Sequence, residues 1–475
     1  MNLNEWFLLF LSFNLIIFGG SYKLFKLAGV EGWKSLIPIY NIVKHLDIIN
    51  RPRWWAILVF IPVINLLMIP VIWIEFIKTF NHNSKLDRLL VIFTLGFYIY
   101  YISYLSSKTK YIGKISFSNF EKSIGSFIWA IVFATIVHNY ILQPFVIPTG
   151  SLEKTLRVGD FLLVSKFHYG ARIPSTVLSF PMVHDTIPII KSRSYLNKPQ
   201  LPYLRIPGFQ EIKNNDIVVF NWPADTVRKF FVKEKGVIKP RDKKSNYVKR
   251  AIGIPGDTLE IKDGVIYLNG IENILPDRAK PLFTYLIKSN KGVSSSKLIN
   301  LEIDGFIRKF IISNLSNDSY TEISKYILNI SNTKENEYVV YTYDKGIPID
   351  VVRDYGLDIR EIIDNKKELN LTYLDAVKIK NSNEFDTIYR LTEKINVSNS
   401  NFFPNNKRFT WNNDQLGPLY IPRAGDKIDL TISLLPLYKK IITDYEYNEL
   451  SVVEGDVLIN GKVEQEYIFK QDYYW

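Results

Sequence analysis

Four apolar stretches constrain this chain most, because each is a candidate for a membrane-crossing helix. They cover residues 3–19, 54–76, 89–105 and 124–145 of the 475-residue chain. A crossing helix needs roughly 20 mostly apolar residues, and the third stretch is short and rich in tyrosine. The first stretch lacks a basic leader and is followed by more hydrophobic stretches, so it is not a cleavable signal peptide. The pattern predicts several transmembrane helices before a soluble part.

Lys and Arg in the short connections predict the orientation, because cytoplasmic loops are enriched in these residues. The connection 20–53 carries six of them and 106–123 carries four, whereas 77–88 carries three. If the two richer connections lie inside, both chain termini lie outside. We therefore expect a multi-pass protein of the bacterial cytoplasmic membrane, with the part after Phe145 on the periplasmic or outer side.

Composition removes several classes of function. The chain has no cysteine, which excludes a thiol nucleophile, disulfides and thiolate metal sites. The net charge of +12 permits anionic lipid or nucleic acid as a partner, but Lys and Arg are scattered and no recognition motif is present, so we expect no nucleic acid. A channel or transporter is poorly supported, since Glu75 and His138 are among the few ionisable groups in the spans.

Short runs with a period of two predict strands in the soluble part. Residues 216–220 are typical of a buried strand, and residues 258–261 and 265–268 flank a Lys-Asp-Gly turn, which indicates a hairpin. Residues 457–459 run into another turn, Asn460-Gly461. Residues 282–401 differ, being polar and rich in Asn, Ser and Lys, and we interpret them as an inserted α+β subdomain to which the sequence assigns no function.

These boundaries predict a membrane-anchored, mostly-β protein whose large antiparallel β-domain carries the insertion. The expected segments are three transmembrane helices with basic cytoplasmic loops (1–123), an anchoring helix (124–147), the first part of the β-domain (148–281), the insertion (282–401) and the second part of the β-domain (402–475).

A serine follows the last apolar stretch in the sequence Pro148-Thr149-Gly150-Ser151, which places it close to the membrane surface. Gly150 permits close approach of the backbone. The Thr149 hydroxyl and the Ser151 amide could together form an oxyanion hole. A Thr-Gly-Ser sequence alone is more often a turn than a nucleophile, so the chemistry depends on a base.

Lys249 is the better candidate for that base. The other candidates are His168 and His184, the only histidines beyond the last span, and neither stands in a triad-like context. In a strand, Tyr247 and Lys249 share one face and Arg250 points to the other. Burial can lower a lysine pKa from about 10.4 by roughly 3–5 units, which yields a neutral base, although a lone strand lysine is usually solvated.

Together these segments resemble the bacterial type I signal peptidases, a family with a Ser/Lys dyad. The nucleophile box resembles residues 145–156 followed by 159–164, and the lysine box resembles residues 247–257, with the strand 216–220 between them in the family's order. Trp411-Asn412 and residues 417–422 resemble the Bacteroidetes-like branch. The resemblance covers about residues 124–475 and is weakest in the insertion.

The resemblance implies a membrane-bound serine endopeptidase that cleaves signal peptides from exported preproteins after Ala-X-Ala, close to the secretion translocon and without metal or cofactor. Ser151 would attack, Lys249 would take its proton, and Thr149 with the Ser151 amide would bind the oxyanion. The implied S1 and S3 pocket residues are Phe145, Ile147, Leu152, Leu156, Tyr247 and Val248. Leu152 replaces the family's usual methionine, a volume-conserving change. Structural positions near the site are Gly150, Arg250, Gly256 and Asp257.

One box of the family is missing from the sequence. A Gly-Asp-Asn-Arg stretch followed by Ser-x-Asp-Ser-Arg is expected directly after residues 469–475, and the sequence stops at Trp475. In the family, that serine contacts the base lysine and that aspartate pairs with the arginine matched by Arg250. Two interpretations are open: an incomplete version of an active enzyme, which we favour, or a shortened protein with weak or no activity that binds exported chains.

Overall fold

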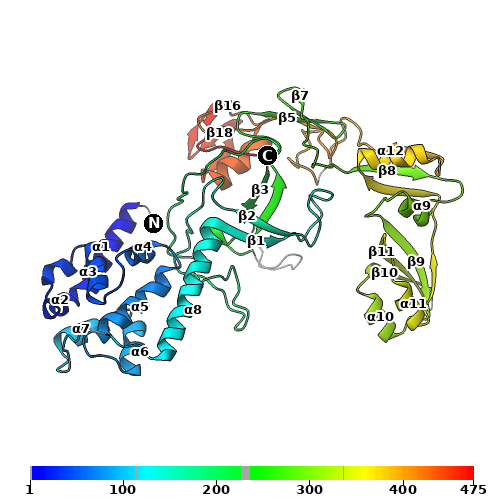
Figure 1. Cartoon of the computed structure of the whole chain (residues 1–475). Helices are drawn as coiled ribbons and strands as arrows, with labels where there is room; N and C mark the ends of the chain where they lie inside the picture. Colours follow the sequence, from blue (N-terminus) through cyan, green and yellow to red (C-terminus); the bar gives the residue numbers. More distant parts are fainter. Residues whose placement is uncertain (1–2, 114, 226–235, 335, 400) are drawn as a thin grey trace. The chain divides into compact units, whose positions relative to one another are not determined.

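The computed structural model describes residues 3–113, 115–225, 236–334, 336–399 and 401–475 (Figure 1). The chain forms two compact units. The first comprises Met1–Pro148, Gly159–Ile212 and Ile217–Lys249, and the second comprises Thr149–Val158, Lys213–Asp216 and Arg250–Trp475. Each unit has apolar cores of its own.

Short helices pack around one apolar core in the N-terminal part of the first unit. They are α1 (Leu3–Gly19), α2 (Tyr22–Leu27), α3 (Tyr40–Ile48), α4 (Trp55–Phe60), α5 (Asn65–Lys78), α6 (Lys85–Phe93) and α7 (Tyr98–Tyr104). Phe25, Phe76 and Phe80 are fully buried in this core. Many other large apolar side chains on the same helices are exposed, Phe7, Ile57 and Phe93 among them.

Two of the four predicted spans are interrupted, so the expectation of continuous helices there is wrong. Residues 54–76 form α4 and α5, with a break at residues 61–64. Pro62 in that break has no amide to donate, and Val63 has a φ of +72°. Residues 89–105 are broken between α6 and α7, where Leu95 and Gly96 have φ values of +51° and +88°.

The two ends of the predicted span 54–76 lie next to each other. The Arg51 guanidinium donates two hydrogen bonds to the Glu75 carboxylate, at 2.8 and 2.7 Å. The ends of a helix that crossed a bilayer would be separated by about 30 Å. The start of α4 and the end of α5 therefore lie on the same side of the helical core.

Helix α8 (Asn119–Ile136) continues into a π-helical turn (Val137–Ile141), and together they form the one helix among the described residues that is long and apolar enough to cross a membrane. Its start is set by a capping box, in which the Ser118 hydroxyl accepts from the Glu121 amide and the Glu121 carboxylate accepts from the Ser118 amide. The predicted fourth span is thus helical up to Ile141.

Two strand pairs follow in the first unit. Strand β1 (Leu142–Val146) begins directly after the π-helical turn and pairs antiparallel with β2 (Phe161–Ser165). Strand β3 (Ile217–Asn221) pairs with β4 (Asn246–Arg250). The predicted strand at 216–220 is present as β3, but its residues are partly exposed rather than buried.

Small antiparallel sheets dominate the second unit. They are β15 (Leu416–Tyr420), β5 (Thr258–Lys262), β6 (Val265–Leu268) and β7 (Ile271–Glu272) in one sheet, β16 (Lys427–Asp429) with β20 (Glu466–Ile468), and β17 (Leu450–Val453), β18 (Asp456–Ile459) and β19 (Lys462–Val463). The hairpin predicted between β5 and β6 is confirmed, because Asp263 and Gly264 both have a positive φ. Helix α13 (Leu435–Lys440) packs into one apolar core with residues of these three sheets.

Residues 283–390, which correspond to most of the predicted insertion, form two sheets with separate cores. One sheet consists of β13 (Lys366–Leu371), β8 (Phe283–Lys288) and β14 (Thr387–Arg390), packed with α9 (Ser295–Asn300) and α12 (Tyr373–Ser382). The other consists of β10 (Ile327–Lys334), β11 (Glu337–Tyr343), β9 (Ile307–Ser313) and β12 (Asp358–Glu361), packed with α10 (Asn317–Ile323) and α11 (Ile349–Asp354).

One sheet of the insertion is nested in sequence within the other, because β9 to β12 lie between β8 and β13. Central strand β8 comes first in the insertion but is flanked by the late strands β13 and β14, whereas β11 is flanked by the earlier strands β9 and β10. Similar turns follow both central strands, because the amides of Gly292 and Gly346, both at positive φ, bond the carbonyls of Ser289 and Tyr343. The insertion therefore consists of two lobes with separate cores.

Candidate active site

Ser151 lies in the connection between β1 and β2, which begins after Val146. In this hairpin Val146 lies opposite Phe161, and the Ile147 backbone bonds both Asp160 and Gly159, at 3.0 and 2.9 Å. Ile147 is buried, with 3% of its surface exposed. The chain then becomes exposed over Thr149, Gly150 and Ser151.

A single helical turn follows the candidate nucleophile. The Glu153 amide donates to the Gly150 carbonyl at 3.0 Å, and the Leu156 amide donates to the Leu152 carbonyl at 2.7 Å. The Thr155 hydroxyl fixes this turn to the Arg278 carbonyl at 2.9 Å. A Cβ atom on Gly150 would lie 2.7 Å from the Glu153 carboxylate, so a side chain there would displace Glu153.

Lys249 lies in β4 and is partly buried. Its Nζ atom lies 5.9 Å from the centre of the Tyr247 ring, which agrees with the predicted sharing of one strand face. The Tyr247 ring in turn lies 5.3 Å from that of Trp222. Desolvation by burial lowers the pKa of Lys249, because the ammonium form loses hydration. The shift has the direction that a general base requires.

The loop 171–206 holds the segment that leads into β4. The Asp242 carboxylate accepts from the hydroxyls of Ser175 and Thr176 at 2.9 and 2.7 Å. The Lys243 ammonium donates to the buried Ser179 hydroxyl at 2.6 Å. These contacts restrain the approach to the strand of Lys249.

Arg250 is held by a backbone group. Its guanidinium donates to the Asn215 carbonyl at 2.7 Å. Desolvation by burial lowers the pKa of Arg250 below its ordinary value. The guanidinium is held by a backbone dipole rather than by a counter-ion.

Gly256 and Asp257 shape the turn after β4. Gly256 has a φ of +95°, and a Cβ atom there would lie 2.5 Å from the Arg423 guanidinium. Burial alone would raise the pKa of Asp257, but hydrogen bonds from the Ile254 amide and the Asn214 side chain lower it on balance. The ionised carboxylate ties residues 214, 254 and 257 together.

The structure describes the two halves of the predicted dyad in different units. Ser151, Leu152 and Leu156 belong to the second unit, whereas Phe145, Ile147 and Tyr247 to Lys249 belong to the first. The pairing of Ser151 with Lys249 stays a prediction.

Lys166 is a titratable residue that was not among the predicted site residues. Burial lowers its pKa to about 8, and its ammonium lies 5.8 Å from the Phe145 ring centre. It follows Ser165, which pairs with Leu142 at the end of the hairpin nearest α8, whereas Ser151 follows the opposite end. Five residues of strand separate those ends, about 16 Å. No motif marks Lys166, because its burial arises from tertiary packing.

The alternative bases have other environments. The His168 ring contacts the Ser165 hydroxyl and stacks on Phe167 with ring centres 4.7 Å apart. Burial lowers the pKa of His184. Among the described residues, no group of three His, Asp or Glu side chains could hold a metal ion.

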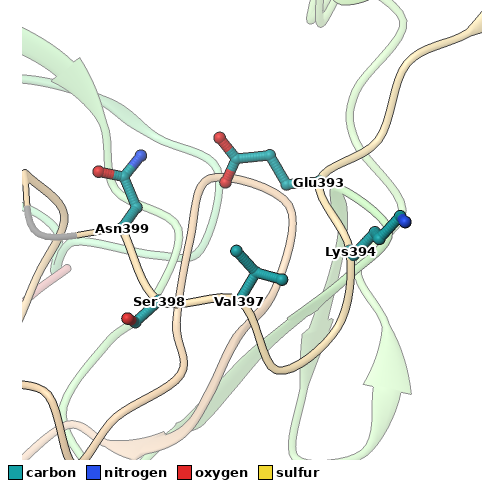
Figure 2. Close-up of a pocket in the computed structure, with 5 residues that line it drawn as sticks. All are labelled: Glu393, Lys394, Val397, Ser398 and Asn399. Carbon is teal, nitrogen blue, oxygen red and sulfur yellow. The ribbon is translucent and has the colours of Figure 1, made fainter.

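The second unit contains a pocket after β14. It is lined by Glu393, Lys394, Val397, Ser398 and Asn399, which follow β14 (Figure 2). Figure 2 shows Lys394 pointing away from the space that Glu393 and Val397 face. None of the predicted catalytic or substrate-binding residues lines it.

Two family models match the chain. Residues 121–298 match the family described as signal peptidase, peptidase S26, and residues 33–114 match a family of unknown function, DUF5684. The first match contains both Ser151 and Lys249, and the second covers most of the short helices before α8. No solved structure matches the chain.

Curated relatives carry the name signal peptidase I. The one from Rickettsia massiliae is 32% identical over 145 residues, which is 30% of this chain and 41% of the relative. The one from Pseudomonas aeruginosa is 32% identical over 187 residues, 38% of this chain and 50% of the relative. The chain thus matches half or less of the length of these relatives.

Proposed function

We propose that this chain, which carries a peptidase S26 domain at residues 121–298, is a membrane-bound serine endopeptidase of the signal peptidase I type. Its substrates would be exported preproteins, cut after small residues in the pattern Ala-X-Ala. The observation that carries the proposal is that one family match contains both boxes, with the serine at 151 and the lysine at 249.

In the proposed reaction, Ser151 attacks the scissile carbonyl while neutral Lys249 accepts its proton. The Thr149 hydroxyl and the Ser151 amide stabilise the oxyanion. The proton then passes from Lys249 to the leaving amine, and water hydrolyses the acyl-enzyme. Support comes from the exposed Ser151 turn and from the burial that lowers the pKa of Lys249.

The pocket assignment belongs to the same proposal. The S1 and S3 pockets would be lined by Phe145, Ile147, Leu152, Leu156, Tyr247 and Val248. These side chains are apolar or aromatic, and each is partly or fully buried. Small apolar residues on the substrate would fit such pockets.

For the membrane topology we propose two crossings, α8 and the shorter apolar helix α1 of 17 residues, with residues 20–118 on the cytoplasmic side of the inner membrane and the catalytic part on the periplasmic side. The Trp6 indole donates to the Gln200 carbonyl at 2.9 Å, which supports placing the N-terminal end of α1 on the same side as the loop 171–206. The Arg51–Glu75 contact supports a pair of helices that enters the bilayer and returns. Broken helices are tolerated at such depth where protein buries them. The secretion translocon would supply substrate nearby.

A second candidate is a membrane protein that binds exported chains without cutting them.

Cleavage of an Ala-X-Ala preprotein by the purified chain in lipid nanodiscs separates the two candidates. We expect cleavage, and we expect Ser151→Ala and Lys249→Ala each to lower the rate by at least about 10²-fold, the usual contribution of a general base. Lys166→Ala and His168→Ala serve as matched controls with retained activity. Binding of preprotein without cleavage would establish the second candidate, and loss of activity in His168→Ala but not in Lys249→Ala would exclude the dyad.

A further inference from the structure

We infer that the helical module of residues 20–113, most of which matches a family of unknown function, is an intramolecular seat that fixes the rotation and depth of helix α8 in the membrane. The inference rests on the proposed function only for its consequence, the height at which Ser151 meets a membrane-bound substrate. The seat itself is carried by contacts within the first unit.

The first contact is a cluster of charges at the start of α8. The Glu121 carboxylate accepts from the Lys78 ammonium at 2.8 Å and lies 2.9 Å from the Arg88 guanidinium. The Lys78 side chain is 2% exposed and that of Glu121 is 18% exposed. A buried cation next to a single carboxylate strongly disfavours any sliding of α8, because movement would leave both charges unpaired.

The segment before α8 joins the same cluster. The Lys78 ammonium also lies 4.6 Å from the centre of the Phe117 ring, and the Arg51 guanidinium lies 5.3 Å from it. The Ile112 amide donates to the Thr79 carbonyl at 2.8 Å. The connection between α7 and α8 is therefore attached to the end of α5 by backbone and side-chain contacts.

The second contact lies further along α8, on one face. The Trp129 ring lies 5.7 Å from that of Trp54 and 5.2 Å from that of Trp55, which begins α4. One turn later Val132 is fully buried in the core of the module. Phe127 and Phe133, on other faces of α8, are 67% and 68% exposed.

Two separated contacts restrain a helix more than one does. The charge cluster at Glu121 fixes the position along the helix axis, and the aromatic contact at Trp129 fixes the rotation about it. Strand β1 follows the π-helical turn that extends α8, and Ser151 follows β1 by five residues. A seated α8 would therefore hold β1, from which the segment of Ser151 continues, at a constant height above the bilayer.

The absence of cysteine allows a direct test of the seat. Nitroxide labels on Ile57→Cys and Phe127→Cys, at exposed positions of the module and of α8, report the distance between them in nanodiscs by pulsed electron paramagnetic resonance. We expect one narrow distance peak in the otherwise unchanged chain and loss of that peak in Glu121→Gln. Lys122→Gln, which removes an exposed charge from the same helical turn, is the matched control and should keep the peak.

A second readout tests the consequence. A preprotein with two Ala-X-Ala sites, set at different distances from its apolar segment, should be cut mainly at one site by the unchanged chain and at both sites by Glu121→Gln. A short soluble peptide should be cut equally well by both proteins. Lys78→Met combined with Glu121→Gln removes the buried cation, and this double variant should recover part of the narrow peak.

The outcomes separate the two proposals. A narrow peak that persists in Glu121→Gln would overturn the seat, whatever the enzyme does. Loss of the peak in Glu121→Gln with no peptide cleavage by the unchanged chain would support the seat and refute the proposed function. Equal loss of the peak in Lys122→Gln would also refute the seat, since it would indicate general instability of α8.

Discussion

The guanidinium of Arg250 donates to the backbone carbonyl of Asn215 at 2.7 Å, which ties the residue after Lys249 to the turn before β3. Adjacent backbone groups strengthen this tie, because the Asn215 amide donates to the Ala251 carbonyl at 2.6 Å and the Ala251 amide donates to the Asp216 carbonyl at 2.8 Å. The end of β4 is therefore held by backbone hydrogen bonds of Ala251 and by the side-chain hydrogen bond of Arg250.

Arg250→Ala should lower the free energy of unfolding by about 1.5–3 kcal/mol, the usual contribution of a hydrogen bond with a charged partner. It should also lower kcat on an Ala-X-Ala peptide, because Lys249 loses a restraint on the adjoining residue. Urea titration in detergent micelles measures the first effect. Arg360→Ala, at an exposed position of β12, is the control, and equal destabilisation by both variants would contradict the prediction.

Peptide cleavage should rise with pH through a single step whose midpoint lies below 10.5, the ordinary pKa of lysine. The reason is that only neutral Lys249 accepts a proton and that burial lowers its pKa. The pH dependence of kcat/KM between pH 6 and 11 measures this midpoint. Lys166→Met should leave the midpoint unchanged. A midpoint that moves in this variant would show that Lys166, and not Lys249, is the base.

Stability should rise with pH between about 8 and the ordinary lysine value, owing to Lys166. Its pKa in the folded chain is about 8, below that of the unfolded chain, so the unfolded state binds more protons in this window. Folding is therefore favoured as the pH increases. Melting temperatures at pH 7, 8, 9 and 10 should show a smaller rise in Lys166→Met than in the unchanged chain, and identical slopes would refute the assignment.

The insertion contacts the turn that carries Ser151, through an ion pair between Lys154 and Asp304. Burial would raise the pKa of Asp304, but this contact lowers it on balance. Asp304→Asn should lower kcat with little change in KM, since Lys154 would no longer hold the turn. A double-mutant cycle with Lys154→Met measures the coupling, which should be about 0.2–1 kcal/mol for a partly exposed pair. Additive effects of the two variants would contradict a direct contact.

The lobe of β9 to β12 should be dispensable for cleavage of a short peptide. Its core shares no residue with that of the other lobe, and it contains none of the predicted site residues. The Ile362 amide bonds the Lys309 carbonyl at 2.9 Å, so its two ends lie close together. Replacement of residues 308–361 by a short Gly/Ser linker should leave the peptide rate unchanged. A loss of activity with preserved circular dichroism would instead assign this lobe a role at the site.

The local signals in the sequence were sufficient for some elements. The Lys-Asp-Gly turn led to the β5–β6 hairpin, because a left-handed Asp-Gly pair suits only a few turn geometries. Once residues 246–250 form a strand, the alternation of side chains alone places Tyr247 and Lys249 on one face. The apolar run after residue 124 led to the long helix, since length and hydropathy are local properties.

Only the tertiary structure decided the rest. Hydropathy alone could not show that Arg51 and Glu75 meet, because the contact depends on a break at Pro62 and Val63. The partner of Arg250 is a backbone carbonyl 35 residues away, which leaves no trace in side-chain composition. The burial that lowers the pKa of Lys166 is likewise supplied by distant residues. Sequence determines which groups are present and their local geometry, whereas long-range packing decides which groups lose water and find a partner.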